Sequence, residues 1–292
     1  MARKISNEIF YNSLTKGELM CAMQCVAEDK KNLSLQIRKD YLNIYYRGGN
    51  ILKINGVNSF FFNENYFGKE NPNRKGEKEK LVDIFRSKNY KVFFDNAKSI
   101  MDKWLDNFPK PEREEQHKLI VENSDEQIAS DFVIIDIEFE VSTEAEYKSK
   151  RFICNKKGQE FRKKPRFDII AIRKKDNMLC VIELKKGTKA LKNNSGIDDH
   201  LEDFDTSIGN NPQPFIEEIT ILLKQKQTMG LLDRKLKISN NCKKPLFMFA
   251  YSYNSEDELN QYKDIHGKSN CKDIPTIKLP KGEIILLENN LL

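Results

Sequence analysis

Two acidic residues and one lysine carry the clearest chemical signal in this sequence. Asp168 lies in the apolar run 166–173, and Glu183 and Lys185 lie in a second apolar run, 178–185. Side chains two residues apart in a strand share a face, so Glu183 and Lys185 are expected to point the same way. Carboxylates are the ligands that a hard divalent cation prefers, and a lysine beside them can hold or deprotonate a water molecule.

The turn between the two runs decides which residue faces Asp168. A four-residue turn over 174–177 places Asp168 opposite Glu183, with Cβ atoms about 4.5–5.5 Å apart. A two-residue turn places Asp168 opposite Lys185 instead, as an ordinary cross-strand ion pair. Two carboxylates that face each other in an apolar strand pair repel, and a divalent cation between them would remove that repulsion. The sequence leaves both registers open, and we favour the first.

The triplet Glu-x-Lys has little meaning alone. It occurs at 28–30, 146–148 and 183–185. Only the last of these lies in an apolar strand that follows a strand aspartate. The context of the triplet therefore predicts a metal site on the hairpin 166–185.

Charge is distributed unevenly along the chain. The formal net charge is +6, but the segment 148–192 holds sixteen Lys or Arg and four acids, and so carries +12 by itself. The segment 193–223 has seven acids and no Lys or Arg. A basic block of this kind is either a solvated surface or a site for a polyanion, whose binding is driven by the release of counterions.

Other features exclude several classes of protein. The six cysteines form no C-x-x-C pair and the three histidines are far apart, so neither a disulfide scaffold nor a histidine zinc site is expected. No P-loop, Rossmann glycine pattern or Ser/Cys–His nucleophile motif is evident. The start of the chain lacks the apolar core of a signal peptide, and no run of about 18 apolar residues exists. We therefore expect a cytoplasmic protein that does not enter a membrane.

The first part of the chain reads as a helix followed by a β-meander. A rough 3.6-residue period predicts a helix over 6–28. Short β-type runs separated by turn residues then predict strands at 33–38, 41–46, 51–55 and 59–63. The polar stretch 64–80 predicts a loop or linker.

The rest of the chain alternates helices and strands. Helices are predicted at 78–88, 91–107, 111–121, 197–204 and 214–231. Strands are predicted at 131–142, 151–154, 166–173, 178–185, 245–252 and 283–287. This order is typical of an α/β (α+β) protein with a mixed central sheet flanked by helices.

The hairpin residues resemble a known family, the PD-(D/E)XK or restriction-endonuclease-like nuclease superfamily. The likeness covers about residues 110–252 and rests on Asp168, fourteen intervening residues, Glu183-Leu184-Lys185, and then a helix and a strand. It implies a restriction-endonuclease-like core in which Asp168, Glu183 and the Leu184 carbonyl bind Mg²⁺ or Mn²⁺. It also implies that Lys185 activates the attacking water.

The family also places an acid on the helix before the first core strand. Glu112, Glu114 and Glu115 compete for this role, and we favour Glu115.

Two segments depart from the family pattern. Arg166-Phe167 stand before Asp168 where the family name has a proline. The segment His200-Leu201-Glu202-Asp203-Phe204 stands where RecB-like members carry Gln-x-x-x-Tyr, which argues against that subgroup but not against the core.

These features lead to a functional hypothesis. We expect an N-terminal helix and β-meander extension over 1–75 and a nuclease-like domain over 76–292. The expected activity is metal-dependent hydrolysis of phosphodiester bonds, in DNA rather than RNA, by an endonuclease or exonuclease. The basic residues expected to contact nucleic acid are Lys163, Lys164, Arg166 and Lys186.

Two further points stay open at this stage. Cleavage of both strands would favour a homodimer, although nothing in the sequence shows one. The alternative to a nuclease is a non-catalytic module that binds nucleic acid or protein and keeps the nuclease fold.

Overall fold

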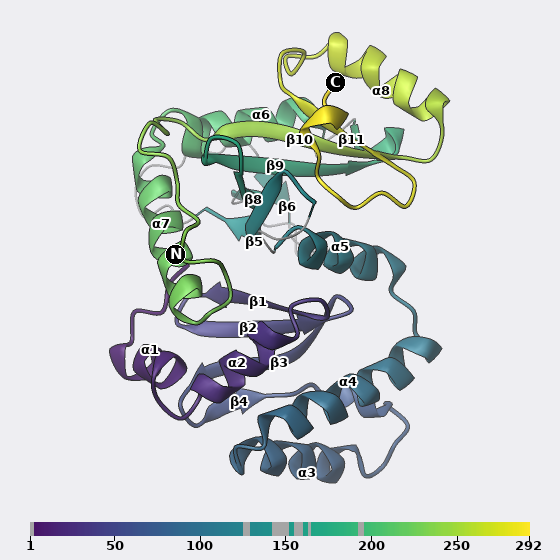
Figure 1. The fold of residues 1–292 in the computed structure, drawn as a ribbon. Helices are drawn as coiled ribbons and strands as arrows, with labels where there is room; N and C mark the ends of the chain where they lie inside the picture. Colours follow the sequence, from purple (N-terminus) through teal and green to yellow (C-terminus); the bar gives the residue numbers. More distant parts are fainter. Residues whose placement is uncertain (1–2, 125–128, 142–151, 155–159, 163–164, 192–195) are drawn as a thin grey trace. The chain divides into compact units, whose positions relative to one another are not determined.

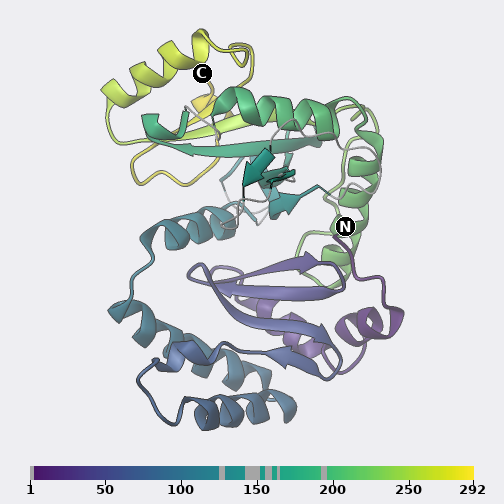
Figure 2. The same ribbon diagram turned by 180° about the vertical axis from the view of Figure 1, so that it is seen from behind.

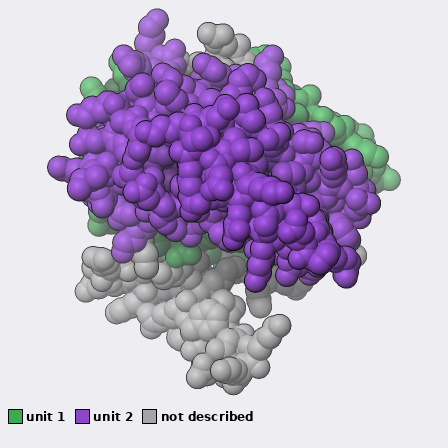
Figure 3. All heavy atoms as spheres, turned by 90° about the horizontal axis from the view of Figure 1, so that it is seen from below, with its two compact units in different colours: residues 1, 127–220, 237–292 green, residues 2–126, 221–236 purple. Residues whose placement is uncertain are grey.

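The chain forms two compact units. The computed structural model describes residues 3–124, 129–141, 152–154, 160–162, 165–191 and 196–292. Residues 2–126 and 221–236 form one unit, called here the N-terminal unit, and residues 127–220 and 237–292 form the other, the C-terminal unit (Figure 3). Each unit contains its own main sheet, so the protein is mixed α/β. Among the described helices, none combines the length and the apolar character needed to cross a membrane.

The sheet of the N-terminal unit is the predicted meander (Figure 1 and Figure 2). Its four antiparallel strands follow one another in chain order: β1 (Leu33–Arg38), β2 (Tyr41–Tyr46), β3 (Gly49–Gly56) and β4 (Ser59–Phe61). The tight turns need residues with positive φ, at Asp40 (52°) between β1 and β2, and at Arg47 (46°) and Gly48 (73°) between β2 and β3. Short polar turns between alternating apolar residues therefore produced the topology that the sequence predicts.

Helices surround this meander. They are α1 (Glu8–Thr15), α2 (Met20–Glu28), α3 (Arg74–Arg86), α4 (Tyr90–Asn107) and α5 (Pro111–Glu122), with a short 3-10 helix, η1 (Glu64–Phe67), before α3. The segment 64–80, predicted as a loop or linker, thus contains η1 and the start of α3. Phe85 of α3 packs edge-on against Tyr90 and Phe93 of α4, with ring centroids 4.9 and 5.0 Å away. Because α3, α4 and α5 belong to the N-terminal unit, the division of the chain does not coincide with the predicted boundary at residue 75.

The predicted single helix over 6–28 is wrong, because the structure has two helices there. α1 ends where Lys16 leaves the helical region, with φ −148°. The Leu19 amide donates to the Ser13 carbonyl, 2.9 Å away, so the chain turns before α2 begins. The 3.6-residue period continues across this break, so periodicity alone did not reveal it.

The C-terminal unit contains a five-stranded mixed sheet. Its strands are β5 (Phe132–Glu140), β8 (Arg166–Arg173), β9 (Met178–Lys186), β10 (Leu246–Tyr253) and β11 (Thr276–Pro280), in the order β11-β10-β9-β8-β5. β5, β8 and β9 pair antiparallel, whereas β9, β10 and β11 pair parallel. Two short strands, β6 (Phe152–Cys154) and β7 (Glu160–Arg162), form a separate antiparallel pair.

Helical crossovers join the parallel strands, as parallel pairing requires. Between β9 and β10 lie η2 (Thr188–Leu191), α6 (Ile197–Phe204), the π-helical turn η3 (Asp205–Gly209) and α7 (Gln213–Thr228). Between β10 and β11 lies α8 (Glu256–Gly267), and a last 3-10 helix, η4 (Glu288–Asn290), follows β11. α6 has the bounds that the sequence predicts.

The end of the chain differs from the prediction. The segment 283–287, predicted as a strand, is not one: Glu283 Oε1 accepts from the Ile285 amide at 2.9 Å, and the Leu286 carbonyl accepts from the Asp131 amide at 2.9 Å. The edge strand is instead β11, which pairs with β10. α8 was also missed, although Ser255 caps it by accepting from the Glu258 amide at 3.3 Å.

The turn before β3 gives a test of this fold. Gly48 has φ 73°, and a Cβ built on it would lie 2.4 Å from the Arg113 carbonyl oxygen of α5. We expect Gly48→Ala to lower the free energy of unfolding of the N-terminal unit by about 2 kcal/mol or more, because the left-handed backbone and the steric clash add. Thermal melts will measure this loss.

Gly56 provides the matched control. A Cβ at Gly56 has no atom within 4 Å, and Gly56 is absent from the positive-φ residues. Gly56→Ala should therefore melt close to the wild type. Equal melting temperatures for Gly48→Ala and the wild type would contradict the described turn.

Candidate active site

The β8–β9 hairpin has the register that places the two acids together. The ladder pairs Arg173 with Met178 and continues to Ile169 with Ile182. The turn therefore has four residues, and the Asn177 amide donates to the Arg173 carbonyl at 2.9 Å. The alternative register, with Asp168 opposite Lys185, is excluded. One residue beyond the Ile169–Ile182 pair, this register sets Asp168 opposite Glu183.

Beyond the Ile169–Ile182 pair, the contact between β8 and β9 is made by the side chain of Asp168. Asp168 Oδ2 accepts a hydrogen bond from the Leu184 amide at 2.9 Å. A strand residue directs its N–H and its C=O toward the same neighbouring strand, so the Leu184 carbonyl is directed to the same side as Asp168. The acid is thus fixed beside the backbone of the Glu183-Leu184-Lys185 triplet.

Glu183 is a carboxylate deep in the protein. Its side chain is 1% exposed, and β10 places Phe249 beside it in the parallel ladder. Within the described part of the chain, neither of its oxygens accepts a hydrogen bond of ordinary geometry. Two basic side chains approach it, His200 with Nδ1 at 3.0 Å and Lys185 with Nζ at 4.0 Å, both measured to Oε2. Such a carboxylate is strongly unfavourable unless a cation compensates it.

The surroundings of both acids favour their protonated forms. Burial, and then the charge of Glu183, raise the pKa of Asp168 to about 7, while the Leu184 amide and the charge of Lys185 oppose this rise. Burial likewise raises the pKa of Glu183 to about 7, with Lys185 acting to lower it and Asp203 to raise it. A pair with these properties is typical of a functional site.

α6 adds two residues to the cluster that the sequence did not assign to it. His200 is 13% exposed and contacts Glu183, and Asp203, three residues later, is 8% exposed. Asp203 therefore lies on the buried face of α6, although most acids of the segment 193–223 are more exposed. The available signal was the spacing of His200 and Asp203 from the apolar Ile197 and Phe204, which puts all four toward the sheet.

The residues can accommodate a divalent cation with few protein ligands. Among the described residues, no group of three or more His, Cys, Asp or Glu is arranged to hold one metal ion. If a cation binds at the hairpin, Asp168, Glu183 and the Leu184 carbonyl are the groups that could hold it, and water would complete the shell. Mg²⁺ commonly binds through one or two carboxylates and keeps several waters. The Glu183 oxygens, buried and without an ordinary hydrogen bond, fit this role.

The predicted acid on the preceding helix belongs to the other unit. Glu115 lies on α5 of the N-terminal unit and is exposed. Its competitor Glu114 accepts from Arg47 at 2.9 Å, and the side chain of Glu112 is not among those described. The role of Glu115 therefore stays a prediction.

The predicted nucleic-acid contacts are described only in part. Arg166 is 60% exposed at the start of β8 and lies 3.8 Å from Glu138, and Lys186 is exposed at the end of β9. Lys163 and Lys164 lie outside the described residues. The two described positions thus flank the strand ends that carry Asp168 and Lys185.

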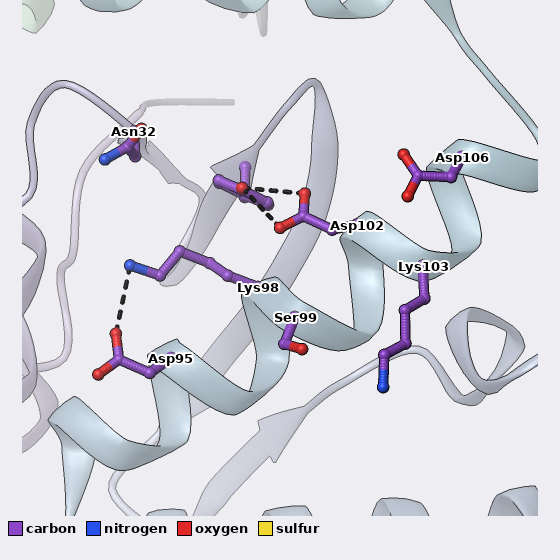
Figure 4. Close-up of a pocket in the computed structure, with 8 residues that line it drawn as sticks. Asn32, Asp95, Lys98, Ser99, Asp102, Lys103 and Asp106 are labelled. Carbon is purple, nitrogen blue, oxygen red and sulfur yellow. Dashed lines mark hydrogen bonds and ion pairs between the residues drawn. The ribbon is translucent and has the colours of Figure 1, made fainter.

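The N-terminal unit has a polar pocket of about 380 Å³ (Figure 4). Several of its charged groups are already paired: Lys98 contacts Asp29, which lies outside the lining, at 2.8 Å and Asp95 at 3.4 Å. Asp102 accepts from Tyr46 at 3.0 Å and from Arg47 at 2.8 Å. These ion pairs and hydrogen bonds give the pocket a structural explanation, so the hairpin remains the candidate active site.

Comparison with protein-family models, curated proteins and solved structures found no significant match to this chain. The chemistry of the site must therefore be inferred from its own residues. A proposed function has to explain why two acids, Asp168 and Glu183, are buried side by side and why a lysine lies next to them.

The pH dependence of stability tests the described environment. Both carboxyl groups have folded-state pKa values near 7, against 3.8 and 4.5 as ordinary values, so the folded chain holds protons that the unfolded chain releases. Their contribution to stability is present at low pH and lost as pH rises to about 7. In chelator, Asp168→Asn should therefore gain stability relative to the wild type between about pH 4.5 and 7.5.

Melting curves at several pH values will measure this gain. Asp264→Asn, on an exposed ion pair of α8, is the control and should follow the wild type at every pH. Parallel curves for Asp168→Asn and the wild type would show that Asp168 does not have the described environment.

Proposed function

We propose that this protein is a divalent-metal-dependent nuclease that hydrolyses phosphodiester bonds, in DNA rather than RNA. The observation that carries the proposal is the buried Glu183 carboxylate, next to Asp168 on the neighbouring strand and to Lys185 on its own strand face. A plain structural ion pair would need one acid and one base. This cluster has a surplus of buried acids, which a divalent cation would neutralise.

Each residue has a distinct role in the proposed chemistry. Asp168 and Glu183 hold the cation, with the Leu184 carbonyl as a third ligand. When bound, Mg²⁺ or Mn²⁺ supplies a Lewis acid that polarises a phosphoryl oxygen. Lys185 is 5% exposed and its Nζ lies on the Glu183 side of the strand, so it can position the attacking water.

The topology around the hairpin supports a restriction-endonuclease-like core. An antiparallel hairpin carries the acids, and a helical crossover through α6 leads to the parallel strand β10 beside β9. This succession agrees with the resemblance to the PD-(D/E)XK family. The N-terminal helices and meander are then an extension that can help to position substrate.

The charge distribution supports a nucleic-acid substrate. The segment 148–192 carries +12, and Arg166 and Lys186 of that segment lie at the strand ends next to the site. Positive charge at these positions matches the phosphate backbone. Cutting both strands of a duplex would need a second copy of the site, as in a homodimer.

Substitutions at the three hairpin residues test the nuclease proposal directly. Asp168→Asn and Glu183→Gln should each weaken Mn²⁺ binding and lower divalent-dependent cleavage about 100-fold or more, because the cation needs charged oxygen ligands. Lys185→Met should bind Mn²⁺ at least as well, because a nearby positive charge is removed, yet cleave about 100-fold more slowly. Calorimetry with Mn²⁺ and cleavage assays on DNA and RNA give both readouts.

Asp264→Asn is the control for these substitutions and should match the wild type in both assays. Cleavage by Asp168→Asn at the wild-type rate would exclude the proposed site. A wild-type chain that binds nucleic acid but cleaves neither DNA nor RNA with Mg²⁺ or Mn²⁺ would support the non-catalytic alternative.

Salt dependence tests the role of the basic block. The combined change of Lys163, Lys164 and Arg166 to Glu should reduce the slope of log K against log salt by about three or more. The reason is that a variant with fewer phosphate contacts releases fewer counterions from the DNA on binding. Fluorescence anisotropy with a DNA duplex in chelator, between about 50 and 200 mM salt, measures the slope.

The control reverses three lysines outside the block. Changing Lys263, Lys268 and Lys272 to Glu, on and after α8, alters the net charge by the same amount. This control variant should keep most of the slope. Equal slopes for the two triple variants would show that the 148–192 block acts only through the net charge of the protein and does not contact the nucleic acid specifically.

A further inference from the structure

We propose that His200 is a positioning residue of the hairpin site: its Nδ1 holds one oxygen of the Glu183 carboxylate and so orients the other oxygen for a divalent cation. This inference rests on the proposed function, because it assigns a residue of α6 to the metal site of the hairpin. The helix α6, which carries His200, then becomes the third element of the site, in addition to the strands β8 and β9.

The contact itself is short and buried. His200 Nδ1 lies 3.0 Å from Glu183 Oε2, closer than Lys185 Nζ at 4.0 Å, as a polar contact that does not have the geometry of an ordinary hydrogen bond. The two side chains that meet are 13% and 1% exposed, so water does not screen their interaction. A glutamate side chain has several rotatable bonds, and a fixed partner reduces the conformational freedom that it would lose on binding a cation.

α6 is held firmly enough to act as a support. Phe204, one turn after His200, stacks on Phe247 of β10 with ring centroids 4.8 Å apart and planes 21° apart. At the start of the helix, Asp198 accepts from the Asn270 amide at 2.9 Å. After its end, Asp205 pairs with Lys244 at 3.2 Å. Contacts at both ends therefore hold α6 against β10 and the loops beside it.

His200 is assigned as a support for Glu183 and not as a metal ligand. Among the described residues, no three His, Cys, Asp or Glu side chains are arranged to hold one metal ion together. Residues that orient metal ligands commonly change metal affinity about 10- to 100-fold when they are removed. His200 should have an effect of that size without touching the cation.

Two substitutions separate a donor role from a packing role. His200→Phe keeps a ring but removes both nitrogens, and His200→Asn keeps an amide nitrogen near the position of Nδ1. We expect the Mn²⁺ dissociation constant to rise about tenfold or more in His200→Phe and to stay within about threefold of the wild type in His200→Asn. At saturating Mn²⁺, the cleavage rate of His200→Phe should recover to within about threefold of the wild type, because its defect lies in metal binding.

The control is His266→Phe, in which a half-buried histidine of α8, stacked on Tyr262, is replaced in the same way. It should bind Mn²⁺ as the wild type does. Melts without metal establish that each variant folds, and His200→Leu replaces His200→Phe if the latter does not fold.

Calorimetry with Mn²⁺ on the full chain distinguishes the outcomes. If His200→Phe binds as tightly as the wild type, or His200→Asn as weakly as His200→Phe, the positioning role is wrong. In either case Asp168→Asn still reports on the site: lost binding in that variant leaves the proposed function intact. If the wild type binds no Mn²⁺, or Asp168→Asn binds it equally well, the proposed function fails and the role of His200 fails with it.

Discussion

The repulsion between Asp168 and Glu183 is the constraint on which the site depends. Burial brings the pKa of each group to about 7, and the charge of Glu183 adds to the rise at Asp168, so two charged carboxylates are unfavourable there without compensation. The Leu184 amide stabilises one of them and Lys185 acts on both. Ionisable groups with strongly shifted pKa values cluster at sites of binding and catalysis. A bound ligand can supply the compensating charge that the protein itself lacks there.

Three structural features bring the two acids together and bury them. The four-residue turn sets the register that brings Asp168 to Glu183, and the parallel strand β10 buries Glu183 beside Phe249. The crossover between β9 and β10 then returns α6 to the sheet and brings His200 to the same carboxylate. Register is a local property, whereas the burial and the histidine contact depend on residues far away in the chain.

This difference explains what the sequence could and could not predict. The hairpin and the meander follow from short-range patterns, namely apolar alternation and turn residues such as Asp40. The spacing of His200 from Ile197 and Phe204 could place it toward the sheet, but no local pattern could relate it to Glu183. The predicted strand at 283–287 failed because Glu283 and Asp131 satisfy its backbone in place of a ladder. Tertiary partners, absent from any local pattern, decided these cases.

The charge of the whole cluster indicates what completes it. When Asp168 and Glu183 are both ionised, Lys185 supplies one positive charge against their two negative charges. A divalent cation would supply the missing positive charge at a point that both carboxylates can reach. The low dielectric around the acids raises the free energy needed to ionise them, and it also strengthens their attraction to such a cation. The same burial that destabilises the empty cluster therefore favours its proposed occupant, and this coupling connects the fold of the hairpin to its chemistry.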